Sequence, residues 1–325
     1  MHANLESMRD REPTEISLLY DLPEGSTLWP VIQRFVRLLR LAWWRAFQHD
    51  AFSVAKAAAY SSILTFFPAL LVIGSVLATS QKTEVYLREI AYALGRILPA
   101  GSSTALGYVK GESLQRPLGL LISASVITLW TGSGVVISWM EGFRNAYQLP
   151  KVWGLIKERM IAFGLVIAAG IPLTFATVLV AFGSRIELRI LFAIGHEFGP
   201  LILLMWTLIR WVIATLTSIA VIALIYHNAV PRTQPWPSVL PGATLATVLW
   251  FVATGMFGWY LQNYADYSVI YGSLGVAITL LVWMYIISLI ILVCAEFNAM
   301  LYPRAMLGKE LKEMPAVKAT PIKRP

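Results

Sequence analysis

The side chains that could do chemistry in this sequence stand at the ends of long apolar stretches. Glu296 and Asn298 follow 29 consecutive residues without a charge, and Glu141, Arg144 and Asn145 end another such stretch. A charged group costs roughly 2.5–3.5 kcal/mol at the centre of a bilayer. Glu296 therefore either reaches water at the end of a helix or enters an internal pair. In the second case Glu296 or Glu141 could also carry a proton.

Helical spacing relates these polar residues to one another. Residues three or four apart share one face of a helix, so Glu141 points the same way as Arg144 or Asn145. Lys56 begins another apolar stretch on the side where these stretches end. We predict a cytoplasmic polar cluster of Lys56, Glu141, Arg144, Asn145, Glu296 and Asn298. Such a cluster could fasten the helices together or line a vestibule.

Arg210 is the one charged residue well inside an apolar stretch, about ten residues past Pro200 and close to Trp206 and Trp211. Two interpretations are open. The side chain can extend along the helix until its guanidinium reaches the outer headgroups. It can instead face an internal cavity and bind an anionic group such as a lipid phosphate, with Asp266 as an internal partner.

The sequence lacks the patterns of common catalytic sites. Its four histidines, His2, His49, His196 and His227, are isolated, and His196 and Glu197 would point apart on a helix. Metal-assisted hydrolysis needs a cluster of His, Asp and Glu. The sequence contains neither a phosphate-binding Gly-x-x-x-x-Gly-Lys-Ser/Thr pattern nor Gly-x-Ser-x-Gly. We therefore expect no enzyme, cofactor or metal site, and no nucleic-acid binding.

The elements that position these residues are transmembrane helices. The chain has 325 residues, of which 57% are hydrophobic and only 14% charged, whereas soluble domains average about 25% charged residues. A bilayer core of about 30 Å needs about 20 apolar residues of helix. Six charge-free windows are long enough: Ala57–Gln81, Pro117–Met140, Met160–Ser184, Trp211–Pro231, Thr233–Ala265 and Tyr267–Ala295. The windows do not alternate as barrel strands would, so we predict an all-α membrane protein with six transmembrane helices.

Two further helices are expected at the lipid interface. In residues 29–49, arginines fall on one helical arc and large apolar residues on the other, which is typical of an interfacial helix facing anionic headgroups. A solvated face of a helix packed on the bundle is the alternative. The first outer loop is long enough to hold a second amphipathic helix. The predicted organisation is a disordered tail at 1–28, the amphipathic helix at 29–49, the six-helix domain at 50–303 and a second disordered tail at 304–325.

The distribution of positive charge predicts the orientation. Of the 26 Lys and Arg residues, 18 fall on the side of both termini and 7 on the opposite side. The positive-inside rule then places both termini in the cytoplasm. The expected partners are membrane lipids, and the sequence is compatible with a homo-oligomer or with envelope protein partners.

Several stretches resemble the YihY/virulence factor BrkB family of bacterial inner-membrane proteins, a family once named ribonuclease BN. The similar stretches are "AAAYSSILTFFPALLVIGSVLA", "WTGSGVVISWMEGFRNAY", the run from "IYHNAVPRTQPWPSVLPGATLA" to "QNYADYSVIYGSLG", and "LVWMYIISLIILVCAEFNAMLY". The resemblance implies a six-helix inner-membrane protein linked to envelope integrity. It also makes the connection after the fifth helix a candidate site, although tyrosines there are typical membrane anchors. With Arg210, the candidate lipid contacts are Asn263, Tyr264, Asp266 and Tyr271.

The sequence thus favours a protein that transports or flips lipids or lipid-linked envelope molecules. The alternative is a non-transporting membrane scaffold that recruits envelope partners.

Overall fold

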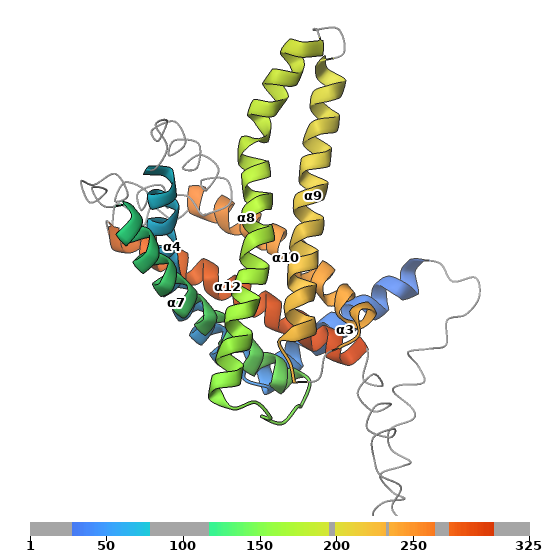
Figure 1. Ribbon diagram of the computed structural model, residues 1–325. Coiled ribbons are helices and arrows are strands. Elements are labelled where there is room, and N and C mark those ends of the chain that lie inside the picture. The colour runs from blue at the N-terminus through green and yellow to red at the C-terminus, as the bar shows by residue number, and fades with distance from the viewer. Residues whose placement is uncertain (1–27, 79–116, 195–198, 232–233, 264–272, 302–325) are drawn as a thin grey trace, which may run out of the picture. The chain divides into compact units, whose positions relative to one another are not determined.

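The computed structural model describes residues 28–78, 117–194, 199–231, 234–263 and 273–301 (Figure 1). Over these residues the chain forms helices and no strands, which confirms the predicted all-α fold class. In order, the helices are α3 (Leu28–Gln48), α4 (Ala51–Ala78), α7 (Pro117–Ala146), α8 (Leu155–Ile194), α9 (Gly199–Asn228), α10 (Trp236–Asn263) and α12 (Ser273–Leu301).

Six of these helices, α4 to α12, are long and apolar enough to cross a membrane. Their windows match the six charge-free stretches of the sequence. A helix satisfies all of its backbone hydrogen bonds internally, so such stretches become helical where water is absent. The prediction of six membrane-spanning helices is confirmed by length and composition.

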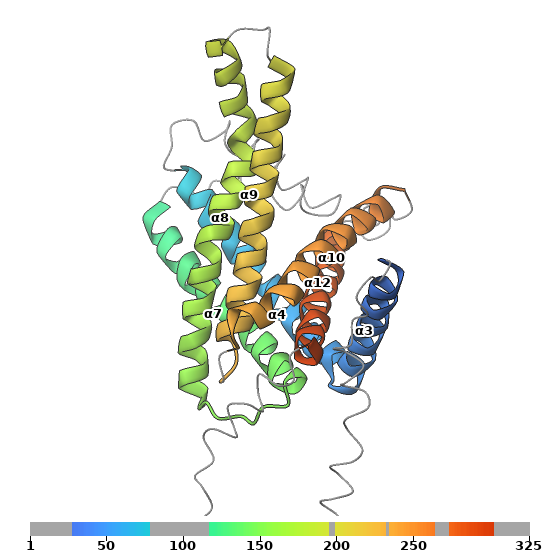
Figure 2. The same ribbon diagram turned by 90° about the vertical axis from the view of Figure 1, so that its right-hand side faces the viewer.

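The six helices pack in a closed series. Each contacts its neighbour in sequence, and α12 completes the series by packing against α4 (Figures 1 and 2). α12 also contacts α7. Half of the membrane-spanning segment of α12 is buried inside the protein, compared with 17% of the corresponding segments of α4 and α8. The most apolar helix of the chain is therefore also the one that the others enclose most fully.

Small residues bring the helices together. A Cβ atom on Gly134 of α7 would lie 3.2 Å from the Ser61 hydroxyl oxygen of α4. On Gly142 it would collide with Leu292 of α12 and approach Val54 of α4 to 3.2 Å. Close backbone approach of this kind is how membrane helices gain packing energy when lipid removes the hydrophobic drive to associate.

α3 belongs partly to each of two compact units, which divide after Leu41. α3 covers nearly the residues of the predicted amphipathic helix, 29–49, and Arg37 and Arg40 in its first part are exposed. In the second unit Trp43 and Phe47 are half exposed or more and lie edge-on to Phe52, with ring centroids 5.5 and 5.7 Å apart. Seating of this helix at the lipid interface stays a prediction.

The third span differs in length from its charge-free window. α8 has 40 residues and is about 60 Å long, twice the thickness of a hydrocarbon core. The helix continues past Ser184 to Ile194. A charged residue is costly inside the hydrocarbon core, but outside the core it does not interrupt a helix. Arg185 and Arg189, expected in a loop, thus belong to the helix. The amphipathic helix expected in the first outer loop and the two predicted tails lie outside the described residues, except for Leu28, which begins α3.

Candidate functional site

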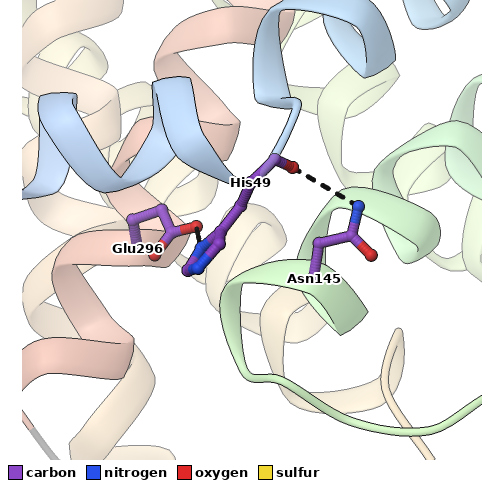
Figure 3. Close-up of polar contacts among 3 residues, drawn as sticks. All are labelled: His49, Asn145 and Glu296. Carbon is purple, nitrogen blue, oxygen red and sulfur yellow. Dashed lines mark hydrogen bonds and ion pairs between the residues drawn. The ribbon is translucent and has the colours of Figure 1, made fainter.

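A histidine and a glutamate meet where α4 begins and α7 and α12 end. The Nδ1 atom of His49 lies 2.6 Å from Oε1 of Glu296 (Figure 3). The two residues are 247 positions apart in the chain. Glu296 is only 2% exposed, whereas the His49 side chain is 24% exposed. Glu296 therefore enters an internal pair and does not reach water directly.

The short turn between α3 and α4 places His49 over α12. The His49 amide donates to the Arg45 carbonyl at 2.8 Å, and Asp50 has a left-handed φ of 57°, which short polar side chains tolerate. The Asp50 carbonyl then accepts from the amides of the first turn of α4. From α7, the Asn145 side-chain amide donates to the His49 carbonyl at 3.4 Å (Figure 3). The turn is thus held by both α7 and α12.

The second carboxylate oxygen of Glu296, Oε2, is buried and has no hydrogen-bond partner within the described part of the chain. Tyr147, just past the end of α7, is also buried, and its phenol interacts with both Glu296 and Asn298. Burial raises the pKa of Tyr147 well above its usual value, the Glu296 carboxylate raises it further, and a hydrogen bond with Asn298 opposes the two. Tyr147 therefore stays protonated beside the carboxylate.

Asn298 joins α12 to α10. Its Oδ1 accepts from the Gly242 amide at 2.7 Å, and its Nδ2 donates to the Val239 carbonyl at 3.2 Å. These two backbone groups flank Pro241, which lacks an amide hydrogen and disturbs the helix around it. Asn298 is 1% exposed and has no charge. It acts as a structural bond between two helices.

A second ion pair joins the end of α7 to the start of α8. Arg144 Nη1 donates to Glu158 Oε1, and both side chains are buried. Lys151 adds a longer contact, with its Nζ 3.7 Å from Glu158 Oε2, but its side chain is 55% exposed. This pair fixes the connection that leads from the second span to the third.

The six residues of the predicted cytoplasmic cluster lie at one end of the bundle but make separate contacts. Arg144, Glu296 and Asn298 are buried, whereas Lys56, Glu141 and Asn145 are exposed. Of these, Glu296 pairs with His49, Arg144 pairs with Glu158, and Asn298 bonds α10. The sequence reasoning missed three partners that lie just outside the apolar stretches, namely His49, Tyr147 and Glu158. The signal available for them was their position beside the ends of spans on the same expected side.

Arg210 lies in the other half of the span. It is 8% exposed, and its Nε and Nη1 atoms are buried without a hydrogen-bond partner among the described residues. The neighbouring Trp211 is exposed and packs edge-on against Phe251 of α10, with ring centroids 6.4 Å apart. The proposed partner Asp266 lies outside the described residues, as do Tyr264 and Tyr271. Asn263 is the last residue of α10.

The described residues contain no group of three or more His, Cys, Asp or Glu side chains that could hold a metal ion. The chemistry that these residues allow is the binding of a proton or of an anionic group. Both kinds of site use charges inside a membrane span, where each charge needs a partner.

Comparisons with known proteins support a membrane protein. The chain is 27% identical over 263 residues to the ribonuclease-like protein YfkH of Bacillus subtilis (strain 168), covering 81% of this chain and 94% of YfkH. It is 24% identical to a UPF0761 membrane protein of Chlorobium luteolum, covering 85% of this chain and 62% of that relative, which is longer. A UPF0761 membrane protein of Tolumonas auensis is 27% identical, with 79% and 83% covered. No solved structure matches the chain. A family model described as virulence factor BrkB matches residues 42–319, which include all six spans, and the chain therefore belongs to the BrkB family of polytopic membrane proteins.

Proposed function

We propose that this protein transports or flips lipids or lipid-linked envelope molecules between the leaflets of the bacterial inner membrane and so supports envelope integrity. The observation that carries the proposal is the burial of Arg210, whose Nε and Nη1 have no hydrogen-bond partner among the described residues. The expected orientation, with both termini in the cytoplasm, comes from the positive-inside rule.

The burial of two Arg210 nitrogens that have no partner within the described residues needs a physical reason. A charge inside the span is costly, and such residues in membrane proteins commonly mark a substrate path. The planar guanidinium matches a phosphate with two parallel hydrogen bonds. A lipid phosphate would supply the acceptors that Nε and Nη1 lack. The free nitrogens therefore support an anionic headgroup as the ligand.

The depth of Arg210 also suits a lipid path. It lies six residues past Leu204, where the α9 window begins, which is roughly 9 Å along the helix. Tyr226, whose hydroxyl donates to the Ile291 carbonyl of α12 at 2.7 Å, follows sixteen residues later, roughly 24 Å away. An arginine that extends to the headgroups would expose its guanidinium on the surface of the bundle. The burial of Arg210 favours the internal interpretation.

The connection between the fifth and sixth spans, expected on the outer side, supplies the other candidate contacts. Asn263, Tyr264, Asp266 and Tyr271 are polar or aromatic, and the connection between the fifth and sixth spans has no Lys or Arg. We propose that these residues contact the polar part of the transported lipid after it leaves Arg210.

Reconstitution into liposomes tests the function. Purified protein is incorporated into vesicles that contain a fluorescent phospholipid, and dithionite quenching from outside measures exchange between leaflets. We expect native protein to speed exchange at least tenfold over empty vesicles and Arg210→Gln to lose that gain. Arg40→Gln, which neutralises an exposed arginine, is the matched control and should behave as native. Equal rates for native protein and Arg210→Gln would overturn the role of Arg210.

A scaffold that recruits envelope partners is the second candidate. The close packing at Gly142 and Gly242, where a Cβ atom would strike a neighbouring helix, favours it because a closed end resists opening. The same vesicle experiment separates the two functions. Native protein that leaves exchange at the level of empty vesicles, for anionic and zwitterionic lipids alike, would support the scaffold.

A further inference from the structure

We propose that His49 and Glu296 form a proton-exchange site, in which the buried carboxylate holds a proton that the His49 ring passes to and from water. No covalent step is involved beyond the making and breaking of N–H and O–H bonds. The proton comes from water at the end of the bundle where α12 finishes, and it returns there.

The distance between the two side chains requires a shared proton. Nδ1 of His49 and Oε1 of Glu296 are 2.6 Å apart, which is a short hydrogen-bond distance for a nitrogen and an oxygen. Two bare lone pairs would repel each other at this distance. A proton therefore lies between the two atoms, either on Nδ1 of a neutral or protonated imidazole or on the carboxyl.

The unpartnered oxygen of Glu296 brings these two arrangements close in energy. When the proton is on His49, Oε2 shares the negative charge but has no donor among the described residues, and burying such an atom is costly. When the proton is on Glu296, the site has no separated charges. A site in which one arrangement gains Coulomb energy and the other avoids desolvation is suited to moving a proton between its two groups.

The different exposure of the two residues supplies the path. Glu296 is enclosed, whereas the His49 side chain is 24% exposed, so the ring can exchange protons with water while it holds the carboxyl. Histidine is the side chain whose protonation ordinarily changes near neutral pH. His49 thus has both the contact and the chemistry of a relay.

The surrounding charges leave this proton free to move. Arg45, on the exposed face of α3, acts on Glu296 electrostatically but makes no ion pair with it, and Tyr147 is a neutral neighbour. On the other helices packed against α12, Lys56 of α4 and Glu141 of α7 are exposed, Arg144 is bound to Glu158, and α10 carries no charged residue. Within the described residues, His49 is the only basic side chain that bonds Glu296.

Infrared difference spectroscopy of the full-length protein in nanodiscs tests the site directly. We expect a carbonyl band from a protonated, dry carboxyl that changes between about pH 5 and pH 9. The band should be lost in Glu296→Gln and kept in Glu141→Gln, which removes an exposed carboxylate at the same end of the bundle. Uniform ¹³C labelling of glutamate should move the band in the native protein, which assigns it to a glutamate even if Glu296→Gln fails to fold. Among the described residues the other buried glutamate, Glu158, is paired with Arg144.

His49→Gln tests the relay. We expect its Glu296 band to remain but to exchange with D₂O at least tenfold more slowly than in the native protein. Absence of any Glu296 carboxyl band over this pH range would show that Glu296 stays ionised and would overturn the proposal. Exchange as fast as native in His49→Gln would exclude His49 as the relay.

Coupling of this proton to lipid movement rests on the proposed function, whereas the infrared experiment does not. In the vesicle assay, native protein should exchange lipid at a rate that changes with pH, and His49→Gln should lose that dependence. A native rate without pH dependence, together with a normal Glu296 band, would exclude coupling and leave the proton site intact. Native protein that moves no lipid would count against the transport function alone.

Discussion

Asn298 of α12 lies against Gly242 of α10 so closely that a Cβ atom on the glycine would collide with the asparagine amide. The same amide bonds the Gly242 N–H and the Val239 carbonyl. A proline in a helix removes one backbone bond and crowds the carbonyl four residues earlier. Asn298 thus holds α12 against the part of α10 in which Pro241 interrupts the helical hydrogen bonds.

Gly242→Ala is expected to lower the free energy of unfolding by about 1–3 kcal/mol because the added methyl group has no space beside Asn298. Gly255→Ala on the same helix is the matched control, since nothing lies within 4 Å of a Cβ there. Thermal unfolding in detergent would give both values. In an Asn298→Ala background the cost of Gly242→Ala should shrink. Equal stability of Gly242→Ala and Gly255→Ala would contradict the close contact between Gly242 and Asn298.

Arg144→Met is expected to destabilise the protein by about 3–5 kcal/mol because it leaves the buried Glu158 carboxylate without its main partner. Lys151→Ala should cost less than about 1 kcal/mol, since that lysine is mostly exposed. Chemical denaturation of the two variants measures the difference. Adding Glu158→Leu to Arg144→Met should recover part of the loss, and a purely additive double variant would argue against a coupled pair.

Arg210→Met should leave the thermal unfolding midpoint unchanged or raise it. A buried guanidinium with unpartnered nitrogens adds a desolvation cost, and an apolar side chain of similar length removes that cost. The same variant should lose lipid exchange. A large fall in the midpoint would instead show that Arg210 has a structural partner. Arg159→Met is a useful comparison, because Arg159 bonds Ser133 at 2.9 Å and stacks on Trp130.

Orientation can be measured with single cysteines in a Cys294→Ala background, where the native buried thiol is removed. Positions 56 and 141 are exposed, so Lys56→Cys and Glu141→Cys should react with a membrane-impermeant maleimide. We expect labelling in inverted vesicles and none in intact spheroplasts, as cytoplasmic positions require. The reverse pattern would place both termini outside. Glu296→Cys should label poorly from either side because position 296 is buried.

Alkaline pH should destabilise the protein through Tyr147. Its pKa is raised in the folded state, so the neutral phenol contributes stability at all pH values below its unfolded pKa of about 10. That contribution decreases as pH rises toward the higher folded pKa. Tyr147→Phe cannot ionise, and its unfolding midpoint should fall less between about pH 8 and pH 11 than that of the native protein. An identical fall in both proteins would show that Tyr147 ionises freely.

The six spans could be predicted from the sequence because length and hydropathy are local properties. The charge-free windows from Ala57 and Pro117 onward correspond to α4 and α7, and small residues such as Gly134 lie where helices meet. The end of α8 was less predictable. Charges end a hydrocarbon span but not the helix itself, so the helix extends ten residues beyond Ser184.

The partners of the polar residues depend on the tertiary arrangement, which local rules do not contain. Spacing along α7 placed Glu141 beside Arg144, yet Arg144 turns inward to Glu158 while Glu141 is exposed. His49 and Glu296 are 247 residues apart, and neither flanking sequence indicates the other. Their meeting requires α12 to pack against α4, which only the closed series of helices provides.

The hydrogen bonds between Asn298 and α10 can form only after the last helix has been synthesised. The fifth spanning helix leaves the ribosome before the sixth. The Gly242 amide and the Val239 carbonyl therefore lack the Asn298 side chain until the last segment is synthesised. A nascent chain halted before residue 298 would present those groups to the insertion machinery and to membrane proteases. The final helix therefore supplies the last hydrogen-bond partners of the helix before it.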